Sequence, residues 1–316
     1  MPTSEDADNP QATRSPYYSL ASFFGAKFGC RVHKISLDAG FTCPNRDGTV
    51  GLGGCVFCNP ESFSPSRRFH QAPIDHQIEE GIRRLKHRQA VDRFVAYFQP
   101  ATNTHAPTRR LRVVYQQALS HPAVVGLVVG TRPDCAADDV LDLLAELSRT
   151  TWVSIEYGLQ SIHDRTLKLL NRGHNYQAFE DAVRRSQERS LAVGAHVILG
   201  LPGESTEDIR ATAHELARLQ LDSVKLHNLY AVRGTPLADW LAAGKVSLPQ
   251  FDQYVGWAVD FIERLPADCV IDRLSGSVPR RYLLGPDWCL DGSAVRRAIE
   301  AEFTRRGTRQ GTHHQR

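Results

Sequence analysis

Three cysteines lie close together near the N-terminus of this 316-residue chain. Cys43 is followed after eleven residues by Cys55, and Cys58 completes a CxxC pair. Four glycines occupy the same stretch, and glycine lets a backbone fold tightly around a bulky ligand because it reaches positive φ without steric cost. Three thiolates from one loop can hold three corners of a cubane iron–sulfur cluster, which leaves the fourth iron free to bind a small molecule.

Two other interpretations of these cysteines stay open from spacing alone. A structural zinc site needs four ligands, and Cys30 would supply the fourth thiolate. A thioredoxin-like redox pair would use only Cys55 and Cys58 and needs no third cysteine. Isolated cysteines are more often small buried apolar residues than ligands. We therefore assign no role to the four scattered ones, Cys30, Cys135, Cys269 and Cys289.

The elements that must position this loop are short apolar runs that alternate with longer amphipathic stretches. The candidate strands span residues 32–38, 94–99, 124–130, 152–160, 193–200 and 223–230. Helical patterns lie between them, near residues 75–91, 108–119, 137–149, 162–170, 175–190 and 205–219. Continuous apolar strands separated by helices predict an α/β fold with a covered parallel sheet. Six such units favour a barrel-like or open doubly wound sheet, and both place functional residues at the carboxyl ends of the strands.

Composition and the ends of the chain set the remaining limits. Hydrophobic residues make up 41% and charged residues 23%, which is typical of globular proteins and excludes a collagen-like or wholly disordered chain. We predict a disordered tail (1–16), a core barrel (17–235), a C-terminal extension (236–306) and a flexible tail (307–316). The acidic N-terminus is unlike a signal peptide and no apolar run is long enough to cross a bilayer. We therefore expect a cytoplasmic protein without membrane partners.

The cysteine loop and the phrases that follow the strands resemble the radical S-adenosylmethionine (SAM) superfamily. The usual motif there is CxxxCxxC, and the longer first gap of this chain resembles the YhcC-like subfamily, which is related to the Elongator catalytic-subunit branch. The phrases that carry the resemblance are KISLDAGFTCPNRDG (34–48), YFQPATNT (97–104), GTRPDC (130–135), EYGLQS (156–161), NRGH (171–174), HVILGLPGE (196–204) and RLSG (273–276).

The resemblance implies a fold, two cofactors and a reaction type. The fold would be a partial (β/α)6 TIM-like barrel of the radical SAM type with a C-terminal extension. Cys43, Cys55 and Cys58 would hold a [4Fe–4S] cluster that reduces SAM, so that a hydrogen atom is abstracted from the substrate. An external one-electron donor would be required.

The predicted SAM contacts follow the ends of three strands. They are Gln99, Asn103, Glu156, Gln160, Val197, Leu199 and Gly200. Gln99 and Asn103 offer neutral polar groups to the amino acid part of SAM, and Glu156 would meet the ribose or the sulfonium unless it pairs with an arginine. In the superfamily a stretch similar to residues 196–203 lies against adenine, although Val197 and Leu199 fit a buried strand equally well.

Charge is the one part of the composition that bears on the substrate. Between residues 66 and 112 there are nine Arg and one Lys against four acids, and residues 296–316 contain six Arg against two Glu. Such segments suit phosphate backbones, but solvated helix faces look the same. The Elongator-like resemblance favours tRNA, with chemistry on a C5 substituent of the wobble uridine. The alternative is a zinc-stabilised RNA- or protein-binding module without catalysis.

Overall fold

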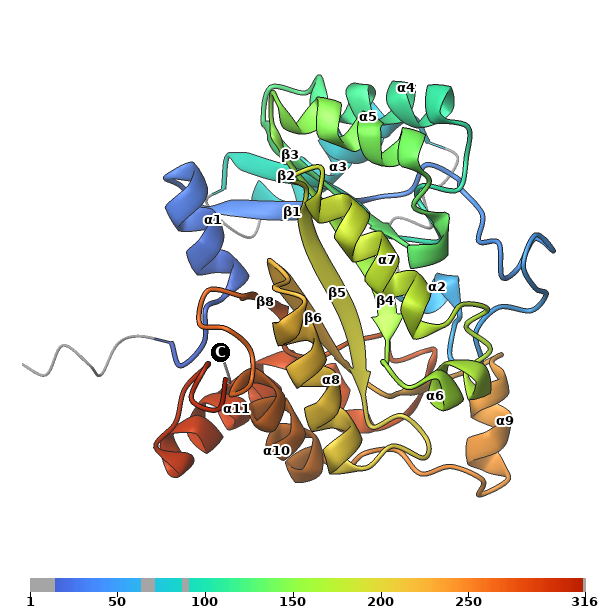
Figure 1. Cartoon of the computed structure of the whole chain (residues 1–316), viewed down its shortest axis with the longest axis vertical. Helices are drawn as coiled ribbons and strands as arrows, with labels where there is room; N and C mark the ends of the chain where they lie inside the picture. The colour runs from blue at the N-terminus through green and yellow to red at the C-terminus, as the bar shows by residue number, and fades with distance from the viewer. Residues whose placement is uncertain (1–14, 64–71, 87–90, 315–316) are drawn as a thin grey trace, which may run out of the picture.

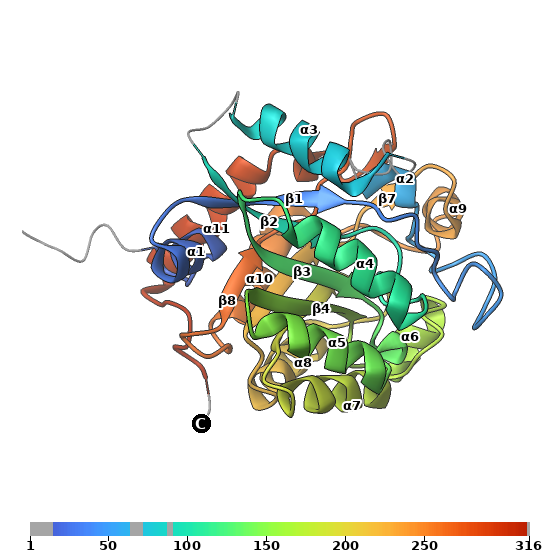
Figure 2. The same ribbon diagram turned by 90° about the horizontal axis from the view of Figure 1, so that it is seen from above.

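One parallel sheet forms the centre of the computed structural model, which describes residues 15–63, 72–86 and 91–314. Its strands in spatial order are β1 (Val32–Leu37), β2 (Arg93–Phe98), β3 (Val124–Thr131), β4 (Trp152–Gln160), β5 (Ala192–Leu199), β6 (Ser223–Asn228) and β8 (Val270–Arg273). All six pairings between neighbours are parallel. The sheet curls into a half-barrel with helices around its outside (Figures 1 and 2). The predicted partial barrel is confirmed.

Helices between the strands cover the outer face of the sheet. They are α3 (Ile74–Lys86), α4 (Thr108–Leu119), α5 (Asp138–Ser148), α7 (Tyr176–Gln187) and α8 (Thr206–Arg218). The short helices α2 (Pro60–Phe63) and α6 (Asp164–Leu169) and a 3-10 turn, η2 (Pro133–Cys135), lie in the connections that follow β1, β4 and β3. The start of α8 shows how local sequence fixes these helices: Ser205 and Asp208 form a capping box. Apolar side chains on the outer face of the strands and the inner faces of the helices form the main core.

The C-terminal extension contributes a strand to the barrel, which the sequence did not predict. β8 pairs with β6 as the seventh strand, although residues 236–306 were expected to lie outside the barrel. The rest of the extension consists of α9 (Pro236–Ala242), α10 (Phe251–Ile262), β9 (Leu283–Gly285), the 3-10 turn η3 (Asp287–Leu290) and α11 (Gly292–Arg306). β9 pairs antiparallel with the two-residue strand β7 (Ala231–Val232).

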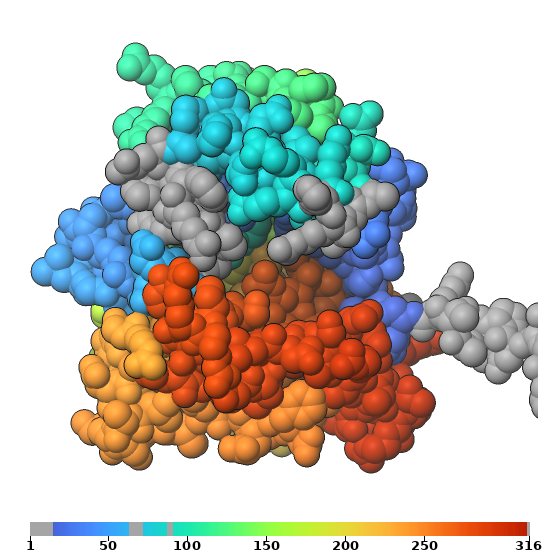
Figure 3. Space-filling model, turned by 180° about the vertical axis from the view of Figure 1, so that it is seen from behind, coloured from blue at the N-terminus to red at the C-terminus, as the bar shows by residue number. Residues whose placement is uncertain are grey.

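The barrel is open between β1 and β8, which are the two edges of the sheet. Figure 3 shows this side as a hollow between the N-terminal third of the chain and its C-terminal residues. At the amino end of the barrel, Ile271 of β8 donates a backbone hydrogen bond to Tyr18 (2.8 Å). The helix that follows, α1 (Leu20–Phe28), packs Phe24 and Phe28 near Trp152 of β4. The cysteine loop lies at the opposite end from α1 (Figures 1 and 2).

The two ends of the described chain meet beside the amino end of the barrel. Gln310 is buried, and its side chain donates to the carbonyl groups of Pro266 (2.6 Å) and Cys269 (2.7 Å) and accepts from the Tyr18 amide (2.8 Å). Residues 307–314 therefore pack against the protein, where the sequence predicted a flexible tail over 307–316. Residues 1–14 of the predicted disordered tail and residues 315–316 lie outside the described residues.

Membrane insertion finds no support among the described helices. None of those in residues 15–63, 72–86 and 91–314 combines the length and the apolar character needed to cross a bilayer.

Replacing Gln310 tests whether the C-terminal residues contribute to stability. Gln310→Ala leaves two carbonyl groups and one amide without partners, and each buried unsatisfied group costs about 1–3 kcal/mol. We expect the free energy of unfolding, measured by urea denaturation, to fall by about 2 kcal/mol or more. Arg309→Ala, a neighbouring exposed position, serves as the control and should change it little. Equal stability of both variants would mean that this segment frays as the sequence predicted.

Candidate functional site

The three cysteines of the loop line one cavity at the carboxyl end of the barrel. Cys43, Cys55 and Cys58 lie between β1 and α2, beside a cavity of about 370 Å³. Residues at the ends of β3 and β4 and just after β2 supply the opposite walls. Parallel α/β sheets place their sites at this edge. We refer to this space as the thiol cavity.

Short side chains and glycines hold the loop in a compact shape. The Asp47 carboxylate accepts hydrogen bonds from the Thr42 hydroxyl (2.6 Å) and the Thr49 amide (3.0 Å). Gly54 has a φ of 82°, and a Cβ atom at this position would lie 2.7 Å from Nε of Arg46. Only glycine fits there. The long gap between the first two cysteines is therefore a folded turn.

Arg172 brings positive charge to Cys55. Its Nη1 donates to the Cys55 sulfur at 3.0 Å, and Nδ2 of Asn45 lies 3.6 Å from the same atom. Arg132 donates to the Arg172 carbonyl at 2.7 Å and forms a two-pronged ion pair with Asp134 (2.9 and 2.7 Å). The Arg172 guanidinium thus places a positive charge next to the Cys55 sulfur.

Polar atoms without partners lie on the walls of the same cavity. Within the described part of the chain, the Thr102 hydroxyl and Nε of Arg172 are buried and make no hydrogen bond. Burial, followed by the neighbouring Cys55, raises the pKa of the Cys58 thiol to about 11. Three soft sulfur donors beside unsatisfied polar groups fit a [4Fe–4S] cluster with a polar small molecule next to it.

The three thiols do not converge on one point. Across the described ranges, no three His, Cys, Asp or Glu side chains are grouped closely enough to hold a single metal ion. A zinc ion needs all its ligands within about 2.3 Å of one atom. In a cubane cluster, each thiolate binds a different iron. The two kinds of site therefore differ in the sulfur spacing that they require.

Three of the residues predicted to contact SAM line the thiol cavity: Gln99, Glu156 and Gln160. Gln160 follows an irregularity in the pairing of β4 with β5 and has a φ of 77°. A positive φ strains any residue except glycine, and such strain concentrates at functional sites. Gln99 accepts a hydrogen bond from the Ser36 hydroxyl at 3.1 Å.

The other predicted contacts lie outside the walls of this cavity. They are Asn103, Val197, Leu199 and Gly200. The Asn103 amide donates to backbone carbonyl groups of β2 and β3 (3.0 and 2.8 Å), so it ties the two strand ends together. Val197 and Leu199 point into the main core, and a Cβ atom on Gly200 would lie 3.1 Å from Pro249 and Trp257. Their contact with SAM stays a prediction.

A group of buried charges inside the barrel was missed by sequence reasoning. Oε1 of Glu156 lies 2.6 Å from Nζ of Lys34, and its Oε2 lies 2.9 Å from Nζ of Lys225 and 2.7 Å from Nε2 of His196. Lys34 also pairs with Asp272, and Nζ of Lys225 lies 3.7 Å from the same carboxylate. We call these five residues, from β1, β4, β5, β6 and β8, the barrel ion cluster.

Burial and charge fix the ionisation of this part of the barrel. Burial would raise the pKa of Glu156, but the two lysines hold it well below its usual range. Burial, with Lys225 as a second cause, lowers the pKa of His196. Burial also holds the pKa of His227, whose ring centre lies 5.5 Å from that of His196, well below its usual value. Glu156 is therefore an anion and both histidines are neutral near pH 7.

A second cavity of about 150 Å³ adjoins the thiol cavity. Both are lined by Phe57, Cys58, Gln99, Gln160 and His196. The remaining walls of the second cavity come mainly from the end of β6, from residues 229–230 and from Arg273 and Ser277. A molecule in this inner cavity would lie next to whatever occupies the thiol cavity.

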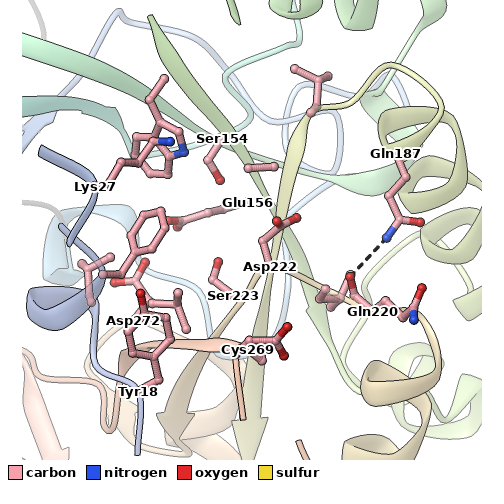
Figure 4. Close-up of a pocket in the computed structure, with 18 of the residues that line it drawn as sticks. Tyr18, Lys27, Ser154, Glu156, Gln187, Gln220, Asp222, Ser223, Cys269 and Asp272 are labelled. Atoms are coloured by element: carbon pink, nitrogen blue, oxygen red, sulfur yellow. Dashed lines mark hydrogen bonds between the residues drawn. The ribbon is translucent and has the colours of Figure 1, made fainter. Parts of the chain in front are cut away.

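A much larger hollow lies at the other end of the barrel. It measures about 1780 Å³ and is lined by residues of α1 and by the amino ends of β4, β5, β6 and β8. Figure 4 shows Glu156 and Asp272 among the side chains around it, together with Tyr18 and Ser223. Glu156 also lines the thiol cavity. The barrel ion cluster thus lies between the hollow and the thiol cavity.

Comparison with known proteins gives consistent matches. The model of the radical SAM superfamily matches residues 43–216, and that of the Radical_SAM C-terminal domain matches residues 221–305. Protein YhcC of Escherichia coli (strain K12) is 39% identical over 277 residues, which cover 85% of this chain and 88% of that protein.

Two further matches are more distant. A tRNA uridine(34) acetyltransferase of Dehalococcoides mccartyi (strain CBDB1) is 28% identical over 162 residues, which cover 50% of this chain and 35% of that protein. Among solved structures, the archaeal Methanocaldococcus infernus Elp3 with an N-terminal deletion has a TM-score of 0.68 at 17% identity. It covers 88% of this chain and 64% of the Elp3 chain, and this likeness shows the fold.

Removing the central carboxylate should destabilise the protein strongly. Glu156→Gln leaves the buried Lys225 and the partly buried Lys34 short of negative charge, and breaking a buried ion pair costs about 3–5 kcal/mol. We expect a loss of that size in the free energy of unfolding at pH 7. Glu146→Gln is the matched control, because Glu146 makes an ion pair with Arg112 at an exposed position (2.5 Å), and exposed pairs contribute little.

The stability difference should depend on pH. Because the folded-state pKa of Glu156 lies below its unfolded value of about 4.3, its contribution is fully present above that value and is lost as the pH falls through the folded pKa. Urea denaturation from pH 7 down to pH 3 should show a constant gap between wild type and Glu156→Gln that narrows only at the acidic end. A gap that narrows near neutral pH would contradict an anionic Glu156 with a lowered pKa.

Proposed function

This chain belongs to the radical SAM superfamily, and from this premise we propose that Cys43, Cys55 and Cys58 hold its [4Fe–4S] cluster. We further propose that SAM lies in the thiol cavity and that the substrate is tRNA, modified on a C5 substituent of the wobble uridine. Together the two cofactors supply one-electron chemistry that removes a hydrogen atom from an otherwise unreactive carbon. Such an enzyme needs an external reductant. We place it in the cytoplasm, where reducing conditions keep thiols free.

The observation that carries the cofactor proposal is that the three cysteines line one cavity together with Gln99 and Gln160. The two amide side chains offer neutral donors and acceptors to the polar parts of SAM. The Glu156 carboxylate already accepts from two lysines and a histidine. We therefore propose that Glu156 positions its neighbours and that the glutamines make the polar contacts to SAM.

Replacing each cysteine in turn tests the assignment. After anaerobic reconstitution with iron and sulfide, we expect Cys43→Ala, Cys55→Ala and Cys58→Ala each to lose the brown colour, the charge-transfer absorption and SAM cleavage. Each variant retains only two thiolates for a cluster that needs three from the protein. Cys135→Ala, which removes another free and partly buried thiol, is the control and should keep all three properties. Colourless wild-type protein with one stoichiometric zinc would contradict the proposal.

The tRNA proposal is supported by the match to a tRNA uridine(34) acetyltransferase, which covers half of this chain. Charge near the site supports it as well. The Arg233 carbonyl accepts a hydrogen bond at 3.1 Å from Asn59, which directly follows Cys58. The Arg233 amide donates to the carbonyl of Tyr282 (2.9 Å), and the Arg281 guanidinium lies 4.9 Å from the ring centre of Tyr282. Two exposed arginines thus lie side by side near the cysteine loop.

The basic segments that the sequence singled out contribute less than their composition suggests. Arg112 lies 2.5 Å from Glu146 and Arg305 lies 2.7 Å from Glu302, so part of their charge is neutralised within the chain. Residues 66–71 and 87–90 of the first segment lie outside the described residues. We therefore assign the phosphate contacts to the arginines beside the site.

Filter binding to bulk tRNA at two salt concentrations tests this surface. We expect salt-sensitive binding by wild type, and a weaker affinity with a smaller salt dependence in the double variant Arg233→Gln/Arg281→Gln. Removing one phosphate contact should lower the slope of log K against log salt by roughly one. Arg305→Gln is the control and should behave like wild type. Binding that does not respond to salt would contradict an RNA substrate.

A further inference from the structure

Arg273 ends β8 at an irregularity in the sheet. Val224 of β6 pairs with Ile271, but the next residue, Lys225, pairs with Arg273, so Asp272 is skipped in the register. Such bulges re-aim side chains and are common beside active sites. Two consecutive residues consequently reach the barrel interior: Asp272 contacts Lys34, and Arg273 lines the inner cavity.

The guanidinium of Arg273 is without a hydrogen-bond or ion-pair partner among the described residues. Nowhere in residues 15–63, 72–86 and 91–314 does the structure record a hydrogen bond or an ion pair to it. The two lysines of the barrel ion cluster, by contrast, share two carboxylates, Glu156 and Asp272. The cluster is therefore balanced in charge, and Arg273 adds one positive charge that nothing in the described chain neutralises.

The inner cavity around Arg273 contains donors but no carboxylate among the described residues. The Nδ2 amide of Asn228, beside the Cys289 thiol, is buried and makes no hydrogen bond of ordinary geometry. Its Oδ1 accepts from the Gly276 amide at 3.0 Å, which fixes the orientation of the group. Ser277 lines the same cavity. A buried donor without a partner costs free energy unless a ligand satisfies it.

We propose that Arg273 and Asn228 form an anion subsite that binds a carboxylate or phosphate group of the substrate. A guanidinium is suited to this task because its planar fork binds either group through two hydrogen bonds. The inference rests on the proposed function, since the inner cavity is a substrate chamber only if cluster and SAM fill the adjoining thiol cavity.

The position of Arg273 separates this subsite from the binding site of SAM. Arg273, Asn228 and Ser277 line the inner cavity alone, whereas Gln99 and Gln160 lie on the boundary that both cavities share. An anion held by Arg273 would therefore lie beyond that boundary, on the far side from Cys43 and Cys55.

The subsite can be tested with inorganic phosphate as the probe, titrated calorimetrically into reconstituted protein that is saturated with SAM. We expect saturable binding by wild type and a dissociation constant about tenfold or more higher in Arg273→Gln, as removal of a charged two-pronged interaction implies. Ser277→Asp should weaken phosphate similarly, because it places a carboxylate in the cavity beside Arg273. Arg280→Gln is the control, since Arg280 is exposed and lies 3.1 Å from Asp287, and it should bind phosphate as wild type does.

Cluster absorption, SAM affinity and thermal unfolding are measured on the same samples. An intact cluster and unchanged SAM affinity, together with phosphate binding weakened about tenfold or more in Arg273→Gln and Ser277→Asp, support the subsite. Phosphate binding that is equal in Arg273→Gln and wild type overturns it, even with the cluster intact. The proposal is also overturned if Arg273→Gln loses SAM affinity tenfold and phosphate competes with SAM. In that case the anion that Arg273 binds would be the carboxylate of SAM. A missing cluster in wild type contradicts the proposed function instead.

Discussion

An ion pair, and not backbone pairing, connects the two edge strands that flank the open side of the barrel. Lys34 on β1 contacts Asp272 on β8 and Glu156 on β4, although β1 and β8 are the two edge strands of the sheet and do not pair with each other. Buried ions are costly unless they are paired and hydrogen-bonded. The contacts therefore favour one curvature of the sheet, the one that brings both carboxylates within reach of a single ammonium group. The size of the cavities inside the barrel depends on that curvature.

Glu156 occupies the centre of this arrangement and faces both ends of the barrel. It borders the thiol cavity on one side and the large hollow at the amino end on the other. The nearby ring of Tyr97 packs below Nζ of Lys225, 4.3 Å from its centre, and its hydroxyl accepts from the same atom. Tyr97 also packs in one apolar cluster with Phe24 of α1. A cofactor bound by the cysteine loop would thus lie next to the barrel ion cluster, whose members already form hydrogen bonds with one another. The residues that line the rest of the thiol cavity would then supply the hydrogen bonds to the cofactor.

The features that sequence predicted are local or follow chain order. The cysteine loop is one segment, and successive β/α units lie side by side, so the strands could be placed in sequence order from β1 to β6. The barrel ion cluster joins residues 122 and 238 positions apart, and those contacts depend on how far the sheet curls. A signal was nevertheless present: Lys34, Lys225 and Asp272 each interrupt an apolar strand, and a charge on a strand covered on both faces requires a partner. The sequence alone did not show which residue would be the partner of each charge.

β8 shows why the C-terminal extension cannot be separated from the barrel. This strand has four residues and follows α10. Such a short strand shows no recognisable hydrophobic period, so the sequence pattern indicated an appended element. In a regular strand Asp272 and Arg273 would point to opposite faces of the sheet. The bulge directs both inward, Asp272 to the ion pair with Lys34 across the open side of the barrel and Arg273 to the inner cavity. The ion pair across the open side and the positive charge of the inner cavity therefore arise from a single register shift, and a change that restored regular pairing would remove one of them.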